Sequence, residues 1–235
     1  MNPSDTNKHD KADVGIIMLD TTFPRIKGDI GNPDTFDFPV QFKNVKDASP
    51  ERIVLAADDR LIQPFIAAGQ ELINTGAKLL TTSCGFLALF HNELNQALDV
   101  PVFSSSLLQV HLAQAIIKKD RKIGILTAHK PALTRRHLAA VGIETYNLEI
   151  MGMEDTREFF DVFIKGKSTL DKAACEMEMG RAARMLKQNH PDIGAVVLEC
   201  TNMPPYRDIV RQETGGLPVF DIVTLVNYAR STVIR

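Results

Sequence analysis

Two cysteines of this 235-residue chain each stand directly after an apolar run. Cys84 closes the run "KLLTTSC" and Cys200 closes the run "GAVVLEC". Short apolar runs of this kind are typical of strands buried in a parallel sheet, and ligands bind outside the carboxyl ends of such strands. If two similar sheets face each other, one thiol lies on each wall of a cleft. That arrangement suits removal of a proton from one face of a carbon and its return to the opposite face.

This chemistry requires one thiolate and one thiol, and it requires no cofactor. Free cysteine has a pKa of about 8.5, which a helix N-terminus lowers. Gly85 and a helical pattern follow Cys84 at once, so we expect a helix dipole to favour the thiolate there. The third cysteine, Cys175, lies in the middle of a helical pattern on an apolar row, and we assign it to packing.

Other cysteine chemistries have less support in the sequence. There is no C-x-x-C or H-E-x-x-H motif and no histidine cluster near either thiol, so we expect no metal. A cysteine hydrolase would need a histidine base. The nearest histidine, His91, falls on an apolar row of its predicted helix, where a packing role is more common. No G-x-G-x-x-G or Walker A loop indicates a nucleotide site.

The elements that carry the first cysteine alternate between strand and helix. The pattern predicts strands over 14–20, 79–84, 100–106 and 122–128, and helices over 64–74, 86–98 and 107–119. Such alternation is typical of parallel βαβ units in an α/β protein. The connection over 21–50 is rich in proline and glycine, with "FPVQF" as its one strand-like stretch, and a connection this long is usually functional.

The pattern then starts over, which indicates an internal duplication. The stretch "VPVFSSSLLQVHLA" is echoed by "LPVFDIVTLVNYA", and Gly15 and Gly124 each open an apolar strand. We therefore predict two similar lobes with parallel sheets, related by a pseudo-two-fold axis, with the active site in the cleft between them. Lobe 1 would span 13–106, with a C-terminal helix at 222–235 packing back on it, and lobe 2 would span 107–221. Residues 1–12 are expected to form a loose tail.

Composition narrows the range of partners. The formal net charge is -2 with scattered lysines and arginines, so nucleic acid is not expected. No segment is long and apolar enough to suggest a membrane span, and an odd number of cysteines without a close pair favours a reducing, cytoplasmic setting. The expected partner is a small-molecule carboxylate. Whether the protein forms a homo-oligomer is left open, because no stretch of the sequence indicates an interface.

The two cysteine motifs carry a family resemblance. "TTSCGF" and "ECTN" resemble the paired motifs of the aspartate/glutamate/hydantoin racemase superfamily, and "GIIMLDTTFPRIKGDIGNP" resembles its aspartate/glutamate racemase family proteins. The resemblance runs from about residue 14 to the end. It implies two Rossmann-like lobes with the site between them. It also implies an isomerase that uses Cys84 and Cys200 as acid and base, without pyridoxal phosphate or metal.

The resemblance further implies which residues bind the substrate. Thr201 and Asn202 match positions that hold a substrate carboxylate, and Asp20, Thr21 and Thr127 resemble pocket positions after the first strand of each half. Amino-acid racemases usually read Cys-Asn-Thr at the first motif, whereas this chain reads Cys84-Gly85-Phe86. Gly85 and Phe86 are therefore expected to contact the substrate and to reshape the pocket.

These observations predict a cofactor-independent racemase or epimerase acting at the carbon α to a carboxylate or carbonyl, on an amino acid or a derivative. The alternatives are an enzyme on the same scaffold that resembles maleate isomerase or arylmalonate decarboxylase, and a non-catalytic protein that binds a small ligand. Glu199 could tune a thiol, bind a substrate amine or pair with a lysine or arginine. Arg25 and Lys27 could bind an anion or remain solvated loop charges.

Overall fold

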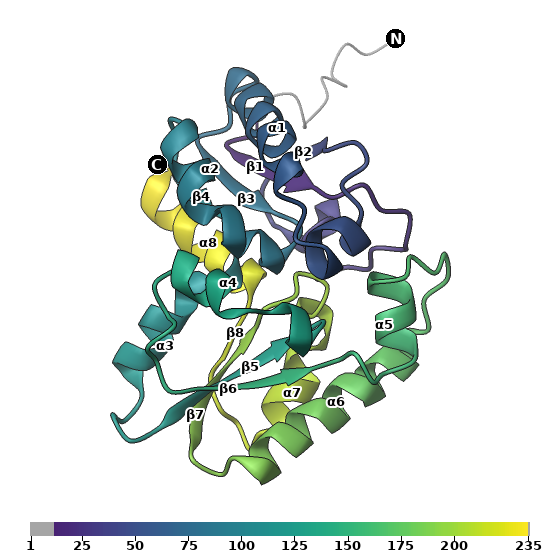
Figure 1. Ribbon diagram of the computed structural model, residues 1–235, viewed down its shortest axis with the longest axis vertical. Coiled ribbons are helices and arrows are strands. Elements are labelled where there is room, and N and C mark those ends of the chain that lie inside the picture. The colour runs from purple at the N-terminus through teal and green to yellow at the C-terminus, as the bar shows by residue number, and fades with distance from the viewer. Residues whose placement is uncertain (1–11, 235) are drawn as a thin grey trace.

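The computed structural model describes residues 12–234 and has two parallel four-stranded sheets, one above the other in Figure 1. The strands are β1 (Val14–Met18), β2 (Val40–Asn44), β3 (Leu79–Thr82), β4 (Val102–Phe103), β5 (Lys122–Thr127), β6 (Leu148–Gly152), β7 (Ile193–Leu198) and β8 (Val219–Phe220). The α-helices are α1 (Ile62–Asn74), α2 (His91–Ala97), α3 (Val110–Ile116), α4 (Arg135–Ala140), α5 (Glu158–Phe163), α6 (Lys172–Asn189), α7 (Arg207–Glu213) and α8 (Ile222–Val233). The predicted α/β architecture with two lobes is confirmed.

The two sheets have the same strand order. The first runs β2-β1-β3-β4 and the second β6-β5-β7-β8, with every neighbouring pair parallel. β1 and β5 occupy the same place in the two sheets, and each contains a glycine near its start that a helix approaches closely. A Cβ on Gly15 would lie 3.1 Å from Leu72 of α1, and one on Gly124 would lie 2.8 Å from Leu186 of α6. The matched order and matched glycines support the duplication inferred from the sequence.

The C-terminal helix, α8, packs against the first sheet. Ile222 and Val226 of α8 share a buried cluster with Val14 and Ile16 of β1, and α8 also contacts β3 and β4. The predicted tail over 1–12 falls almost wholly outside the described residues. Ala12, the first described residue, is buried, and its carbonyl accepts a hydrogen bond from the Gln41 side chain at 2.6 Å.

The helices that follow β3 and β4 begin differently from the prediction. Each starts as a 3-10 helix, Gly85–Phe90 before α2 and Ser106–Gln109 before α3. Turns of this kind are frequent at helix N-termini, and here Gly85–Phe90 contacts α4 and Ser106–Gln109 contacts β7 of the opposite lobe. The long connection after β1 contains β2, as "FPVQF" indicated, and then a π-helix over Glu51–Leu55 that the sequence did not indicate.

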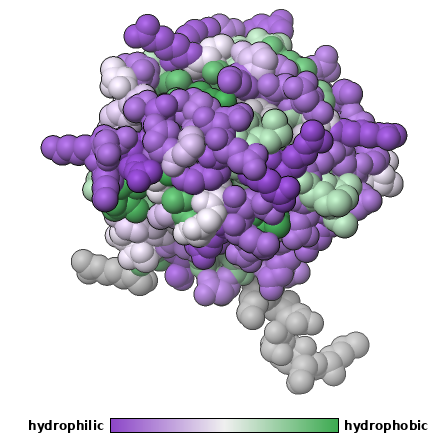
Figure 2. Space-filling model, turned by 90° about the horizontal axis from the view of Figure 1, so that it is seen from below, coloured by the Kyte–Doolittle hydropathy of each residue, from purple (hydrophilic) through white to green (hydrophobic). Residues whose placement is uncertain are grey.

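Within residues 12–234, no helix has the length and apolarity needed to cross a bilayer. Figure 2 shows a face on which hydrophilic residues predominate and hydrophobic ones are scattered among them. Scattered apolar residues of this kind are ordinary on a protein surface and indicate no docking site by themselves.

Candidate active site

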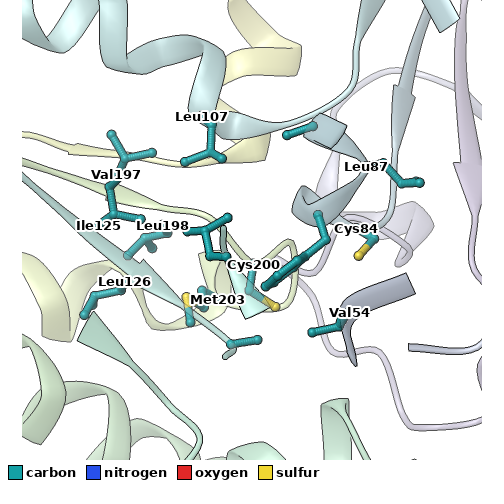
Figure 3. Packing of buried hydrophobic residues seen from close by; sticks show 14 of the residues in the cluster. Val54, Cys84, Leu87, Leu107, Ile125, Leu126, Val197, Leu198, Cys200 and Met203 are labelled. Atoms are coloured by element: carbon teal, nitrogen blue, oxygen red, sulfur yellow. The ribbon is translucent and has the colours of Figure 1, made fainter. Parts of the chain in front are cut away.

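The two cysteines predicted to face each other line one cavity between the lobes. Cys84 follows β3 and Cys200 follows β7, and Figure 3 shows both side chains where the lobes meet, with Val54 nearby. The cavity has a volume of about 20 Å³, and the cysteines are only 7% and 8% exposed. A space this small holds about one water molecule, so the site is closed in this structure.

Hydrogen bonds between the lobes fix the backbone on both sides of the thiols. Thr201 Oγ1 donates to the Ser83 carbonyl at 2.6 Å, one residue before Cys84. Ser106 Oγ donates to the Leu198 carbonyl at 2.6 Å, two residues before Cys200. Both bonds are buried, where a hydrogen bond is electrostatically stronger than in water. The two sheet ends are therefore fastened to each other next to the sulfur atoms.

The environment of Cys84 opposes ionisation on balance. Burial, followed by the charge of Glu199, raises the pKa of Cys84 to about 12. The backbone N–H groups of Phe86 and Leu87, and then Arg25, act in the opposite direction. The lowering expected from the helix N-terminus is thus present, but it is outweighed because the thiol is shut away from water.

Cys200 is held still more firmly as a neutral thiol. Burial, followed by Glu199, raises the pKa of Cys200 well above its ordinary value. Its Sγ donates to Asn202 Oδ1 over 3.5 Å, a bond that only the protonated sulfur can make. The two thiols are therefore in unlike surroundings. Cys84 faces the N–H groups of Phe86 and Leu87, whereas Cys200 faces the Asn202 N–H together with the Asn202 Oδ1 acceptor.

Glu199 enters the site from the end of β7 and is fully buried. Its Oε2 accepts a hydrogen bond from Thr127 Oγ1 at 2.8 Å, while its Oε1 has no partner among residues 12–234. Burial raises the pKa of this carboxyl to about 7. The lysine or arginine partner considered from the sequence is not present among the described residues.

Arg25 comes from the long connection after β1 and reaches the same cavity. Its Nη1 donates to Asp29 Oδ1 at 2.7 Å and its Nη2 to Thr21 Oγ1 at 2.9 Å. A guanidinium has five N–H donors, so further donors remain for a ligand. Arg25 and Glu199 are the charged residues among those that line the cavity.

Apolar side chains cover the site: Phe23, Pro50, Val54, Phe163 and Ile164. The rings of Phe23 and Phe163 meet edge to face, 5.1 Å between centroids. A second, more open cavity of about 430 Å³ lies beyond this cover and shares Thr21, Phe23, Pro50 and Ile164 with the inner one. The shared walls make the outer cavity the natural approach to the thiols.

The structure distributes the expected substrate-binding residues over three places. Those that line the inner cavity with both cysteines are Thr21, Gly85, Phe86, Thr201 and Asn202. Thr127 lies behind Glu199 as its hydrogen-bond donor. Asp20 lines only the outer cavity, because its exposed carboxylate turns away to accept a bond from the Asp47 backbone N–H at 3.0 Å.

Asp29, Phe23 and Phe163 join the site without having been predicted. Asp29 and Phe23 lie in a loop without periodicity, and Phe163 comes from the opposite lobe, so no local pattern marks them.

The packing roles expected for two other residues agree with their surroundings. His91 is half-buried and its Nδ1 contacts Ser104 Oγ at 3.0 Å, while Cys175 is fully buried away from the cavity. Over residues 12–234 no group of three potential metal ligands gathers.

Curated relatives of the chain include lyases. A dimethylsulfoniopropionate lyase of Durusdinium sp. clade D is 30% identical over 92% of this chain and 73% of its own length. Dimethylsulfoniopropionate lyase 5 of Emiliania huxleyi is 26% identical over 93% of this chain, which spans only 45% of that longer protein. The matched region thus includes both cysteine motifs and accounts for part of the longer relative.

Solved structures and a family model agree on the fold. An arylmalonate decarboxylase superposes with a TM-score of 0.62 at 14% identity, covering 94% of this chain and 92% of that one. Allantoin racemase from Pseudomonas fluorescens superposes with a TM-score of 0.58 at 14% identity, covering 94% and 91%. The family model described as Asp/Glu/Hydantoin racemase matches residues 38–227. The chain therefore belongs to the Asp/Glu/hydantoin racemase family of enzymes.

Proposed function

We propose that this protein is a carbon-acid enzyme that removes the proton α to a carboxylate and expels a β-sulfonium group, as a dimethylsulfoniopropionate lyase would. The observation that carries the proposal is that two unlike thiols and one arginine line a single closed cavity. Arg25 would bind the carboxylate, whose negative charge grows as the α-carbon loses its proton. The similarity to dimethylsulfoniopropionate lyases supplies the substrate.

The reaction balances without a cofactor. A cysteine thiolate takes the α-proton, and the electron pair of the broken C–H bond forms the double bond between the α- and β-carbons. The β-carbon to sulfur bond breaks, and its electron pair leaves with the sulfur as neutral dimethyl sulfide. Acrylate remains, and the protonated thiol returns its proton to water when the site opens.

Cys84 is the better base of the pair. Its surroundings include the Phe86 and Leu87 N–H groups and Arg25, each of which favours the thiolate and lowers the pKa of Cys84 against the effect of burial. Cys200 donates to Asn202 Oδ1 and stays protonated, so it suits the role of acid or of a neutral donor to the enolate. An elimination needs only the base, whereas a racemisation needs both thiols.

The cover of the site also favours a sulfonium substrate. Two methyl groups on a cationic sulfur are apolar in contact and weakly hydrated, and aromatic rings attract such cations. Phe23, Phe86 and Phe163 provide that lining. Gly85 and Phe86, which follow Cys84, offer no polar side chain to a more strongly hydrated ammonium group.

The test is proton NMR in D2O with dimethylsulfoniopropionate, together with headspace detection of dimethyl sulfide. We expect acrylate and dimethyl sulfide from the wild type, a loss of roughly a thousandfold in Cys84→Ala, and a smaller loss in Cys200→Ala. Cys175→Ala is the matched control and should keep full activity, because its sulfur lies outside the cavity. If folded wild-type protein formed neither acrylate nor dimethyl sulfide, that result would contradict the proposal.

The second thiol favours one further candidate, racemisation or epimerisation of an α-substituted carboxylate. That reaction would use Cys84 on one face and Cys200 on the other, as first expected from the sequence. With a chiral α-substituted carboxylate in place of dimethylsulfoniopropionate, NMR in D2O would show exchange of the α-proton for deuterium without elimination, and either single cysteine variant would abolish inversion.

A further inference from the structure

Glu199 has an unused carboxylate oxygen in a place where unpaired charge is costly. The residue is fully buried, and its Oε1 has no hydrogen-bond partner in the structure. An ionised carboxylate removed from water without compensation destabilises the fold. A group retained under those conditions needs a reason outside the folding of the chain, and the cavity it lines provides one.

Gly85 makes room for this carboxylate. A Cβ at position 85 would lie 2.2 Å from Glu199 Oε1 and 2.1 Å from its carbonyl oxygen, both far inside contact distance. Any larger residue after Cys84 would therefore displace Glu199. Glycine at 85 and glutamate at 199 belong together in space, although they lie in different lobes and far apart in the sequence.

The charges that line the cavity are arranged for a zwitterion. Arg25 lies on the first lobe and is held by Asp29. Glu199 lies on the second lobe, between the end of β7 and Cys200. Thr127 anchors only Oε2 of Glu199, which leaves Oε1 available. A substrate with a carboxylate at one end and a cation at the other would satisfy both residues while its acidic carbon lies near the thiols.

We propose that Glu199, admitted by Gly85, is the specificity residue that binds the cationic group of the substrate. The inference rests on the proposed function for the identity of that cation, a sulfonium. The expected consequence is selectivity: the site should prefer a zwitterionic propionate to a carboxylate of the same shape that lacks the positive charge. Here Glu199 binds and orients the substrate, while proton transfer remains with the cysteines.

The experiment measures binding, so that it does not depend on turnover. Dimethylsulfoniopropionate and 4-methylpentanoate have the same shape, with CH in place of the sulfonium. Isothermal titration of both into Cys84→Ala protein, with and without Glu199→Gln, gives the ratio of the two affinities. We expect Glu199→Gln to reduce the preference for the zwitterion by roughly tenfold or more, with the affinity for 4-methylpentanoate equal or higher.

A matched control and a second variant complete the test. Glu176→Gln replaces an exposed glutamate on α6 and should leave the ratio unchanged. Gly85→Ala should reduce the ratio as Glu199→Gln does, because the added Cβ displaces Oε1. An unchanged ratio in Glu199→Gln overturns the inference, and so does failure of both compounds to bind. The wild type could also bind dimethylsulfoniopropionate in preference to 4-methylpentanoate, lose that preference in Glu199→Gln, and yet catalyse no elimination. That result would overturn the proposed function and leave this inference standing.

Discussion

Asn202 of the second lobe donates through Nδ2 to Asp29 Oδ2 of the first at 2.6 Å. The other oxygen of Asp29 accepts from Arg25 Nη1 at 2.7 Å. One buried carboxylate therefore joins a residue next to the second cysteine motif to the arginine proposed to bind substrate. The position of Arg25 depends on contact between the lobes as well as on its own loop.

Asp29→Asn should weaken this connection. The amide removes the charge that pairs with Arg25, and breaking a buried ion pair from one side costs roughly 3 kcal/mol. Urea unfolding should show that loss, and the KM of the elimination should rise. Asp34→Asn is the control on the same loop, where an exposed side chain should change the unfolding free energy by less than about 0.5 kcal/mol. Equal stabilities of the two variants would contradict this account of Asp29.

Glu199→Gln should change how stability depends on pH. Burial raises the pKa of Glu199 from 4.5 to about 7, so the folded state holds its proton more tightly than the unfolded state. The contribution of Glu199 to stability is therefore fully present below about pH 4.5 and is lost as the pH rises to about 7, by up to ~3 kcal/mol. The glutamine variant lacks this loss and should gain stability relative to wild type between pH 5 and pH 8, in unfolding experiments at both values.

Glu213→Gln is a control in which the change of stability with pH should have the opposite sign. Arg184 lowers the pKa of Glu213, so this carboxylate contributes stability above its unfolded pKa and loses it in acid. Its removal should destabilise the protein at pH 8 more than at low pH. If Glu199→Gln behaved in the same direction as Glu213→Gln, the raised pKa of Glu199 would be wrong.

The thiols should react slowly with alkylating reagents when no ligand is bound. Cys84 and Cys200 are buried, and their pKa values are raised, so little thiolate is present near pH 7. The rate of modification by iodoacetamide, followed by mass spectrometry of each peptide, should still be rising at pH 9 without levelling off, because both pKa values lie above that pH. Cys84 should react before Cys200, and Glu199→Gln should accelerate both, because the charge of Glu199 opposes both thiolates. Fast modification of Cys200 at neutral pH would contradict the proposed division of roles.

The elimination should remove only one of the two α-hydrogens. Cys84 approaches the substrate from one side, and Arg25 fixes the orientation of the carboxylate, so a single prochiral hydrogen faces the base. With the two stereospecifically monodeuterated substrates, one should give acrylate that retains deuterium and the other acrylate that has lost it. Equal retention from both would mean that both thiols act as bases.

The strands and the meeting of the thiols could be predicted from the sequence because they depend on local and repeated patterns. The apolar runs before Cys84 and Cys200 mark buried parallel strands, and the duplication places both at equivalent sheet ends. The boundary of the helix after Cys84 was less accurate, since its first turn tightens where it meets the opposite lobe. Local propensity carries no information about that contact.

The charges and the cover of the site could not be predicted in the same way. The role of Arg25 depends on Asp29, and the position of Glu199 depends on the absence of a side chain at Gly85. The Phe23 and Phe163 contact joins the two lobes. Each of these relationships is set by distance in space, so no spacing along the chain reports it. For the same reason the sequence indicated proton transfer and an isomerase, and it gave no indication of the elimination proposed above.

The buried hydrogen bonds from Thr201 to Ser83 and from Ser106 to Leu198 have a consequence for how such a scaffold can diversify. They keep the sulfur-bearing backbone of both lobes in register, while the aromatic cover and the outer cavity are built from separate loop and helix segments. Mutations in the cover can then change which leaving group or substituent is accepted without disturbing the geometry proposed for proton transfer. A scaffold divided in this way can acquire new substrates through its periphery, with the same pair of thiols retained beneath.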